Sequence, residues 1–148
     1  MSLNNSFEIS SQGLSAQSSR MQIHANNIAN TNTPYYTRKI PVLSENTNVA
    51  FSDVIQGMRG NVFQAGISFT PSGVNFDGVV QDPTPGQRVY SPGHPQADED
   101  GYVTQSNVNV LSDMADALMS ARLFEANLGV LSITRNMINR SLEIGRNQ

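Results

Sequence analysis

The chain has 148 residues, which is enough for about one domain. Only 14% of them are charged and the net charge is −3, so we expect no basic surface for nucleic acid or for an anionic membrane. Cysteine is absent, which excludes disulfides, thiolate metal sites and cysteine nucleophiles. No basic segment precedes an apolar run at the N-terminus, and the longest apolar run is three residues, so neither a secretory signal peptide nor a membrane-spanning segment is predicted.

The first predicted element is a helix over residues 3–29, which contain no proline. One apolar stripe recurs at intervals of seven residues: Phe7, Leu14, Met21 and Ile28. A thinner stripe, offset by two positions, consists of Ile9, Ala16 and Ile23. His24 is expected to be an ordinary packed or partly solvated histidine of this helix. Two stripes on one helix predict packing against other helices along more than one face.

The helix is followed by residues 25–39, ANNIANTNTPYYTRK. Asparagine tolerates the left-handed conformation of a helix end, and Thr33-Pro34 favours an extended backbone, so this segment is predicted to stop the helix. Two aromatic residues and two cations then lie on a short extended run. It is either an ordinary edge strand or a docking segment that sets the axial register between subunits. Its candidate contact residues are Asn27, Asn30, Pro34, Tyr35, Tyr36 and Arg38.

Residues 31–107 hold all seven prolines and form an irregular, β-rich insert. Short strand-like stretches occur at Arg38–Val42, Val62–Phe63 and Gly78–Val80. The run HPQADED at 94–100 lacks the ligand spacing of a calcium loop or a tetrahedral zinc site, so we interpret it as a solvated acidic turn closed by Gly101. We predict no metal, no cofactor and no enzymatic site, because nucleophile-elbow and phosphate-loop motifs are also absent.

Residues 108–145 carry the clearest periodic signal and predict a second, longer helix. Its first stripe follows alternating steps of four and three: Val110, Met114, Ala117, Ala121, Phe124, Leu128, Leu131, Arg135, Ile138, Leu142 and Gly145. Its second stripe is offset by two residues: Met119, Leu123, Ala126, Val130, Ile133, Met137, Arg140 and Ile144. The charged Arg135 interrupts the first stripe, so we expect it to find a carboxylate or carbonyl partner on another chain.

The length of this second helix decides what its stripes contact. About 36 helical residues span roughly 54 Å, whereas a compact globule of this chain length has a diameter of roughly 38 Å. The shorter N-terminal helix can cover only one stripe. The expected fold class is therefore α+β: long N- and C-terminal helices pack as a coiled-coil-like pair in a helical assembly, with a small Pro/Gly-rich β insert between them.

Three blocks in the expected order resemble the bacterial flagellar rod, hook and hook-associated axial proteins. The first is residues 25–39, and the second is the insert at 82–103, which is similar to that of a proximal rod member. The third is residues 107–145, which begin with Asn-Val-Asn and contain Phe-Glu-Ala-Asn. The resemblance divides the chain into an N-terminal axial helix (1–30), a docking segment with a β-rich insert (31–107) and a C-terminal axial helix (108–148).

The resemblance implies a structural subunit of the proximal rod, a drive shaft around the export channel. Its implied partners are copies of itself, other proximal and distal rod proteins, the rod adaptor, and the membrane-supramembrane ring of the motor. Export through the flagellar type III system to the periplasmic rod is also implied. A soluble helical binding module or export chaperone is the alternative, which the Pro/Gly-rich insert disfavours. The residues expected at subunit interfaces are the candidate contact residues of segment 25–39 together with Phe7, Leu14, Met21, Ile28, Met114, Phe124, Leu128, Leu131, Arg135, Ile138, Leu142, Leu123, Val130, Ile133 and Met137.

Overall fold

The protein is described here by a computed structural model covering residues 3–46 and 73–146. Its elements in chain order are α1 (Leu3–Ala29), β1 (Lys39–Glu45), β2 (Val74–Gln81), β3 (Arg88–Tyr90), β4 (Tyr102–Thr104) and α3 (Val110–Arg146). This is the expected α+β arrangement, with a helix pair formed from the two ends of the sequence. The predicted stretch Val62–Phe63 lies outside the described residues.

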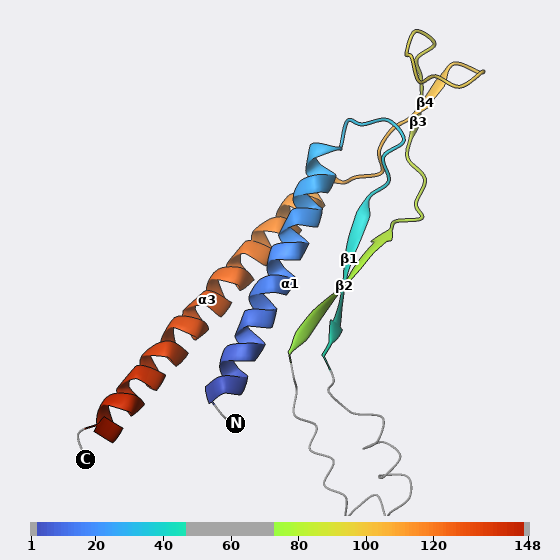
Figure 1. Ribbon diagram of the computed structural model, residues 1–148. Coiled ribbons are helices and arrows are strands. Elements are labelled where there is room, and N and C mark those ends of the chain that lie inside the picture. Colours follow the sequence, from blue (N-terminus) through green and yellow to red (C-terminus); the bar gives the residue numbers. More distant parts are fainter. Residues whose placement is uncertain (1–2, 47–72, 147–148) are drawn as a thin grey trace, which may run out of the picture.

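The two helices run antiparallel and side by side (Figure 1). α1 has 27 residues and α3 has 37, so the C-terminal end of α3 extends past the start of α1. α3 begins at an N-cap, because the side-chain oxygen of Asn109 accepts the amide N–H of Ser112 at 3.2 Å. α1 ends where Asn30 closes the last turn onto the carbonyl groups of Asn26 and Asn27.

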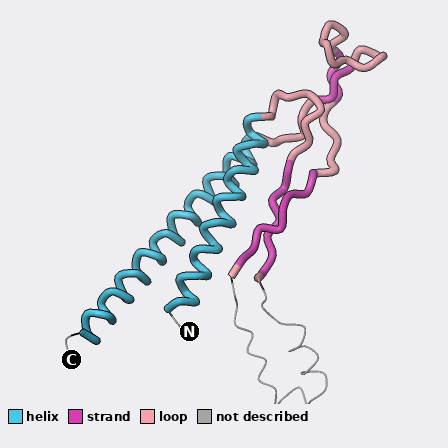
Figure 2. The backbone as a smooth tube through the Cα atoms, in the orientation of Figure 1, coloured by secondary structure: helices cyan, strands magenta, loops and turns pink. Residues whose placement is uncertain are grey.

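A hairpin of β1 and β2 lies along the other side of α1, as the tube of Figure 2 shows. Ile40 pairs with Val80 and Val42 pairs with Gly78, after which the register shifts by one residue. Gly78 sits at this bulge with a φ of 117°, a conformation that glycine adopts without steric cost. Because both strands contact α1 and neither contacts α3 in the described part of the chain, α1 is the middle layer between α3 and the hairpin.

A second hairpin, β3–β4, projects beyond the joined ends of the helices (Figure 1). Tyr90 pairs with Tyr102, and their rings meet edge to face at 5.2 Å between centroids. The connecting turn is acidic and exposed, as expected. The carboxylate of Asp98 accepts the amide N–H of Tyr102 at 2.7 Å, and Gly101 takes a φ of 79°.

The hydrophobic core within one chain is small. Among the described residues, only Ala16 and Val103 are buried hydrophobic residues. The buried polar and charged residues outnumber them: Ser10, His24, Asn27, Asp113, Ser120 and Thr134. In the described part of the chain, neither helix has an apolar stretch long enough to cross a membrane.

Candidate assembly interface

The face that α3 turns toward α1 combines one apolar line with one polar line. The apolar line is half-buried and recurs every seven residues: Val110, Ala117, Phe124, Leu131 and Ile138. Three residues after each of the first four comes a buried or half-buried polar residue: Asp113, Ser120, Asn127 and Thr134. The stripe predicted from the sequence also included Met114, Leu128, Arg135 and Leu142, but these four residues are exposed in the structure. Small and polar side chains occupy the buried positions of α3, because the surface of α1 that they contact is also largely polar.

The surface of α1 that faces α3 is largely polar. Ser10, His24 and Asn27 are buried there, and Gly13 is buried against the side chain of Asn127. A Cβ on Gly13 would lie only 2.8 Å from the amide nitrogen of Asn127, so this glycine permits the close approach of the helices. The predicted apolar stripe of α1 lies at the edge of the contact: Phe7 is exposed, whereas Leu14, Met21 and Ile28 are half-buried.

The second predicted stripe of α3 is bare throughout. We call it the outer seam, and all of its members are exposed: Met119, Leu123, Ala126, Val130, Ile133, Met137, Arg140 and Ile144. Ile133, for example, has 60% of its surface exposed. A soluble monomer rarely leaves such a continuous apolar surface uncovered, so the outer seam has the character of a contact surface.

A polar strip runs along α3 between the outer seam and the exposed line that contains Leu128. Its members are exposed: Arg122, Glu125, Gly129, Ser132, Asn136, Asn139 and Glu143. By helical spacing this polar strip faces away from α1. α3 therefore has an apolar surface on each flank and a polar surface on the side that faces away from α1.

A cluster of hydrogen-bonded side chains lies where α1 ends and α3 begins. We call it the Asp113 cluster, and it is formed by His24, Asn27, Arg38 and Asp113. The carboxylate of Asp113 has no exposed surface and accepts three hydrogen bonds. They come from His24 Nδ1 at 2.8 Å, Arg38 Nε at 2.9 Å and Asn27 Nδ2 at 3.0 Å. Burial acts to raise the pKa of Asp113, but these hydrogen bonds and the charge of Arg38 outweigh it and hold the pKa below its ordinary value. The carboxylate is therefore ionised and paired.

Asn27 joins the cluster to the segment after α1. Its amide oxygen accepts the Lys39 N–H at 3.0 Å, and its amide nitrogen donates to the Lys39 carbonyl at 2.8 Å. The Tyr36 hydroxyl lies 3.0 Å from the same amide oxygen and 2.8 Å from that of Asn26. Burial, and then the charge of Asp113, raise the pKa of Tyr36, so its hydroxyl stays protonated as a donor. A fully buried amide with every hydrogen-bonding group used fixes the start of β1 against α1.

Arg38 links this cluster to the chain that leads into α3. The hydrogen bond to Asp113 raises its pKa, and the nearby carboxylates of Asp82 and Asp116 add to this effect. Its backbone N–H donates to the side chain of Asn107 at 2.6 Å, and Asn107 in turn donates to the Thr84 carbonyl at 2.7 Å. Hydrogen bonds thus join the predicted docking segment to α1 through Asn27, and to the start of α3 and the chain before it through Asp113 and Asn107.

The turn between α1 and β1 contains the remaining candidate contact residues. Asn30 accepts a hydrogen bond from the Thr33 hydroxyl at 3.2 Å. Pro34 and Tyr35 occupy the corners of a turn in which the Tyr36 N–H reaches the Thr33 carbonyl. Tyr35 has a φ of 60°, which a residue other than glycine adopts at some cost. Its backbone N–H donates to the Thr104 carbonyl at 2.9 Å and its hydroxyl to the Gln96 carbonyl at 3.0 Å, which ties the turn to β4 and its loop.

Asp113 is the main functional residue that sequence reasoning missed. The residues expected from the sequence at subunit interfaces include no carboxylate. A signal did exist, because Asp113 is the acidic residue in the first turn of the long helix, and Arg38 has no acidic neighbour in sequence. Only the fold brings them together across 75 residues. His24 is packed, as expected, at 3% exposure.

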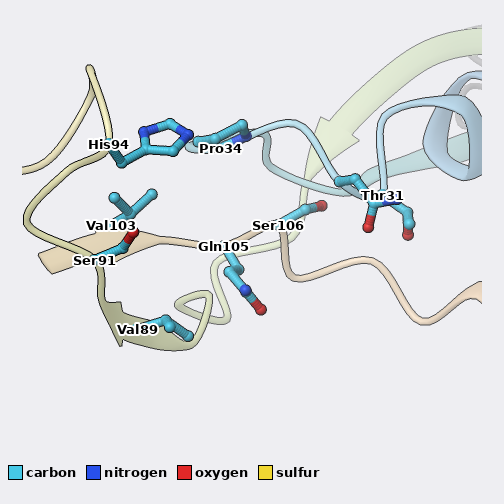
Figure 3. A pocket seen from close by; sticks show the side chains of 9 residues that line it. Thr31, Pro34, Val89, Ser91, His94, Val103, Gln105 and Ser106 are labelled. Atoms are coloured by element: carbon cyan, nitrogen blue, oxygen red, sulfur yellow. The ribbon is translucent and has the colours of Figure 1, made fainter.

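A cavity of about 310 Å³ lies between the turn after α1 and the β3–β4 hairpin (Figure 3). Its lining residues include no Asp, Glu, Lys or Arg: Thr31, Asn32, Pro34, Val89, Ser91, His94, Val103, Gln105 and Ser106. The imidazole of His94 lies beside Pro34 and its Nδ1 accepts the Gln96 N–H at 3.1 Å. The cavity is lined by aliphatic side chains and by neutral hydrogen-bonding groups.

Comparison with known proteins relates both ends of the chain to one assembly. Residues 7–37 match the family described as flagella basal body rod protein, and residues 99–144 match the C-terminal family of flagellar basal body rod FlgEFG proteins. Similar proteins named flagellar basal-body rod protein FlgC occur in Buchnera aphidicola subsp. Baizongia pistaciae, with 31% identity, and in Yersinia enterocolitica, also with 31%. The protein of that name from Salmonella typhimurium is 30% identical. Each comparison covers 99% of this chain and 100% of the relative.

Proposed function

The chain belongs to the FlgC family of flagellar basal-body rod proteins, and we propose that its two terminal helices build the rod by packing against those of neighbouring subunits. It is a structural subunit of that rod. The observation that carries the proposal is the outer seam, a bare apolar surface on a chain with only two buried hydrophobic residues in its described part. Covering this seam in an assembly supplies the hydrophobic stabilisation that the chain lacks on its own.

The layering of the chain supports an order of helices within the rod. α1 has α3 on one side and the β1–β2 hairpin on the other, so its surface is mostly covered. α3 has apolar surface on both flanks and the polar strip in front. In the proposed rod, α3 helices of neighbouring subunits pack flank to flank, and their polar strips face a water-filled export channel. α1 forms the next layer outward, and the two hairpins lie on the outside.

The proposed partners are copies of the chain, the other proximal and distal rod proteins, the rod adaptor and the membrane-supramembrane ring. The subunit reaches the periplasmic rod through the flagellar type III channel. Torque passes from subunit to subunit through packing contacts, so the proposed function needs no catalytic step, cofactor or metal. Arg135, which lines a surface groove with Phe7, Leu128 and Leu131, is proposed to pair with a carboxylate or carbonyl of another subunit.

Two adjacent residues of α3 allow a matched test. Ile133 belongs to the outer seam and Ser132 to the polar strip, and both are exposed in the single chain. Ile133→Asp is expected to abolish rod assembly and swimming, because an unpaired carboxylate buried between helices costs several kcal/mol in every copy. Ser132→Asp adds the same charge beside water and is expected to leave swimming intact.

The readouts are soft-agar swimming and the number of completed hooks counted by electron microscopy. Circular dichroism of both purified variants checks that helix content is equal. Normal swimming of the Ile133→Asp strain would contradict the proposal, and so would equal defects in the two strains.

A further inference from the structure

The β3–β4 hairpin carries a cavity on one face and a protruding ring on the other. Successive side chains of a strand point to opposite faces. Val89 and its partner Val103 line the cavity described above, whereas Tyr90 and its partner Tyr102 stand on the opposite face. Tyr90 has 64% of its surface exposed, the largest exposure of any aromatic residue in the described part of the chain. One hairpin thus presents two different surfaces in opposite directions.

The cavity fits a neutral aromatic side chain with a polar tip. Its volume of about 310 Å³ is at the small end of the roughly 300–1,000 Å³ that ligand sites occupy, which suits a single ring. Pro34, Val89 and Val103 supply aliphatic walls. Nδ1 of His94 accepts the Gln96 N–H, so Nε2 is the ring nitrogen that remains to bond a phenol oxygen.

The charges of the nearby groups narrow the choice of side chain that could occupy the cavity. The acidic turn, which includes Asp98, would leave carboxylates unpaired in a cavity without cations, so it is excluded as an occupant. Beside Tyr90, the guanidinium of Arg88 pairs with Asp98 and lies 4.9 Å from the centre of the Tyr102 ring, so a cation offsets one carboxylate of the acidic turn. Tyr35 is excluded because its hydroxyl already bonds the Gln96 carbonyl.

We propose that Tyr90 of one subunit inserts into this cavity of a neighbouring copy of the same chain. The contact is heterologous, since two different surfaces meet, and repeated heterologous contacts produce rings or helical filaments rather than closed pairs. Tyrosine is a frequent anchor in protein interfaces because it combines a large apolar ring with a hydrogen-bonding tip. The inference rests on the proposed function, and it adds a lateral contact outside the helical layers.

The absence of native cysteine makes disulfide mapping direct. Strains that express Tyr90→Cys and Gln105→Cys versions with different tags assemble mixed basal bodies, which are purified and oxidised. The expected product is a heterodimer that joins the two tags. A double variant with both substitutions is expected to give a ladder of higher oligomers. Tyr102→Cys mixed with Gln105→Cys is the matched control, because Tyr102 is the ring partner of Tyr90 and is less exposed; its yield is expected to be at least tenfold lower.

A variant that keeps an aromatic ring covers the case in which Tyr90→Cys fails to enter rods. A benzophenone amino acid at position 90 is expected to cross-link to residues of the cavity wall in a second copy, identified by mass spectrometry. Incorporated subunits that give no such product, equal yields for positions 90 and 102, or a product with another protein would each overturn the inference while leaving the proposed function intact. Failure of the unmodified chain to enter rods would overturn the proposed function itself.

Discussion

The two ends of the helix pair are built on opposite principles. At the closed end, where α1 stops and α3 begins, the Asp113 cluster holds three segments together through buried, charge-assisted hydrogen bonds. At the open end, Phe7 is exposed, and the last turns of α3 extend past α1 with Leu142 and Ile144 bare. The chain therefore fixes its own geometry at one end and leaves apolar surface for neighbours at the other. Hydrogen bonds hold the closed end of the single chain together, whereas the apolar surface at the open end is buried only in the proposed rod.

The largest expected effect follows from removing the centre of the closed end. Asp113→Ala leaves Arg38, His24 and Asn27 without their shared acceptor, so the free energy of unfolding is expected to fall by about 3–5 kcal/mol. Asp116→Ala is the matched control, since this carboxylate is partly exposed and 3.7 Å from the same guanidinium; its expected cost is below about 1 kcal/mol. Urea denaturation measures both. Similar losses in the two variants would remove the distinction between a buried and a surface pair.

The pH dependence of stability sharpens the same comparison. The pKa of Asp113 in the folded chain lies below its ordinary value of about 3.9. The paired carboxylate therefore contributes stability above that ordinary value, and the contribution is lost as pH falls through the folded-state pKa. The free energy of unfolding is expected to decrease between about pH 5 and pH 2. Asp82 and Asp98 also have lowered pKa values, so the measurement is the difference between the native chain and Asp113→Asn. Parallel curves for the two proteins would show that Asp113 is not the titrating group.

A smaller effect is expected from the hydroxyl at the edge of the cluster. Tyr36→Phe removes the hydrogen bond to the Asn26 and Asn27 side chains and keeps the ring, which should cost about 1 kcal/mol. Tyr35→Phe removes an exposed hydrogen bond to Gln96 and should leave the helix pair unchanged. Hydrogen exchange of the amides at residues 24–29 distinguishes the two. Faster exchange there in Tyr35→Phe but not in Tyr36→Phe would reverse their assigned roles.

The smallest effect is expected in the polar line toward the open end. The hydroxyl of Thr134 donates to the Val130 carbonyl of its own helix at 2.9 Å and makes no hydrogen bond to the described side chains of α1. Thr134→Val therefore leaves no polar group of α1 without a hydrogen-bond partner. The change in the free energy of unfolding should stay within about 0.5 kcal/mol. A loss above about 2 kcal/mol by thermal or urea unfolding would show that the polar line itself holds the helices together.

Several elements of the fold could be predicted from the sequence because their signals are local. Proline-free, heptad-spaced segments marked both helices, but the sequence left open which of the two stripes of α3 lies against α1. The stretches Arg38–Val42 and Gly78–Val80 foreshadowed β1 and β2, although the strands are longer than expected. The short strands β3 and β4 were missed, because three-residue strands between turns carry no periodic signal.

The amino-acid sequence by itself determined the helices, their apolar lines and the family of the protein, since periodicity, proline positions and motif blocks act over short distances. The tertiary structure alone decided which face of α3 is buried. The missing side chain of Gly13 leaves room for Asn127 between the helices. Asp113 accepts hydrogen bonds from His24 and Arg38, which lie 89 and 75 residues away in the sequence. The polar line of α3 therefore packs against α1. A buried carboxylate is stable only where its donors converge, and that convergence exists only after the chain has folded.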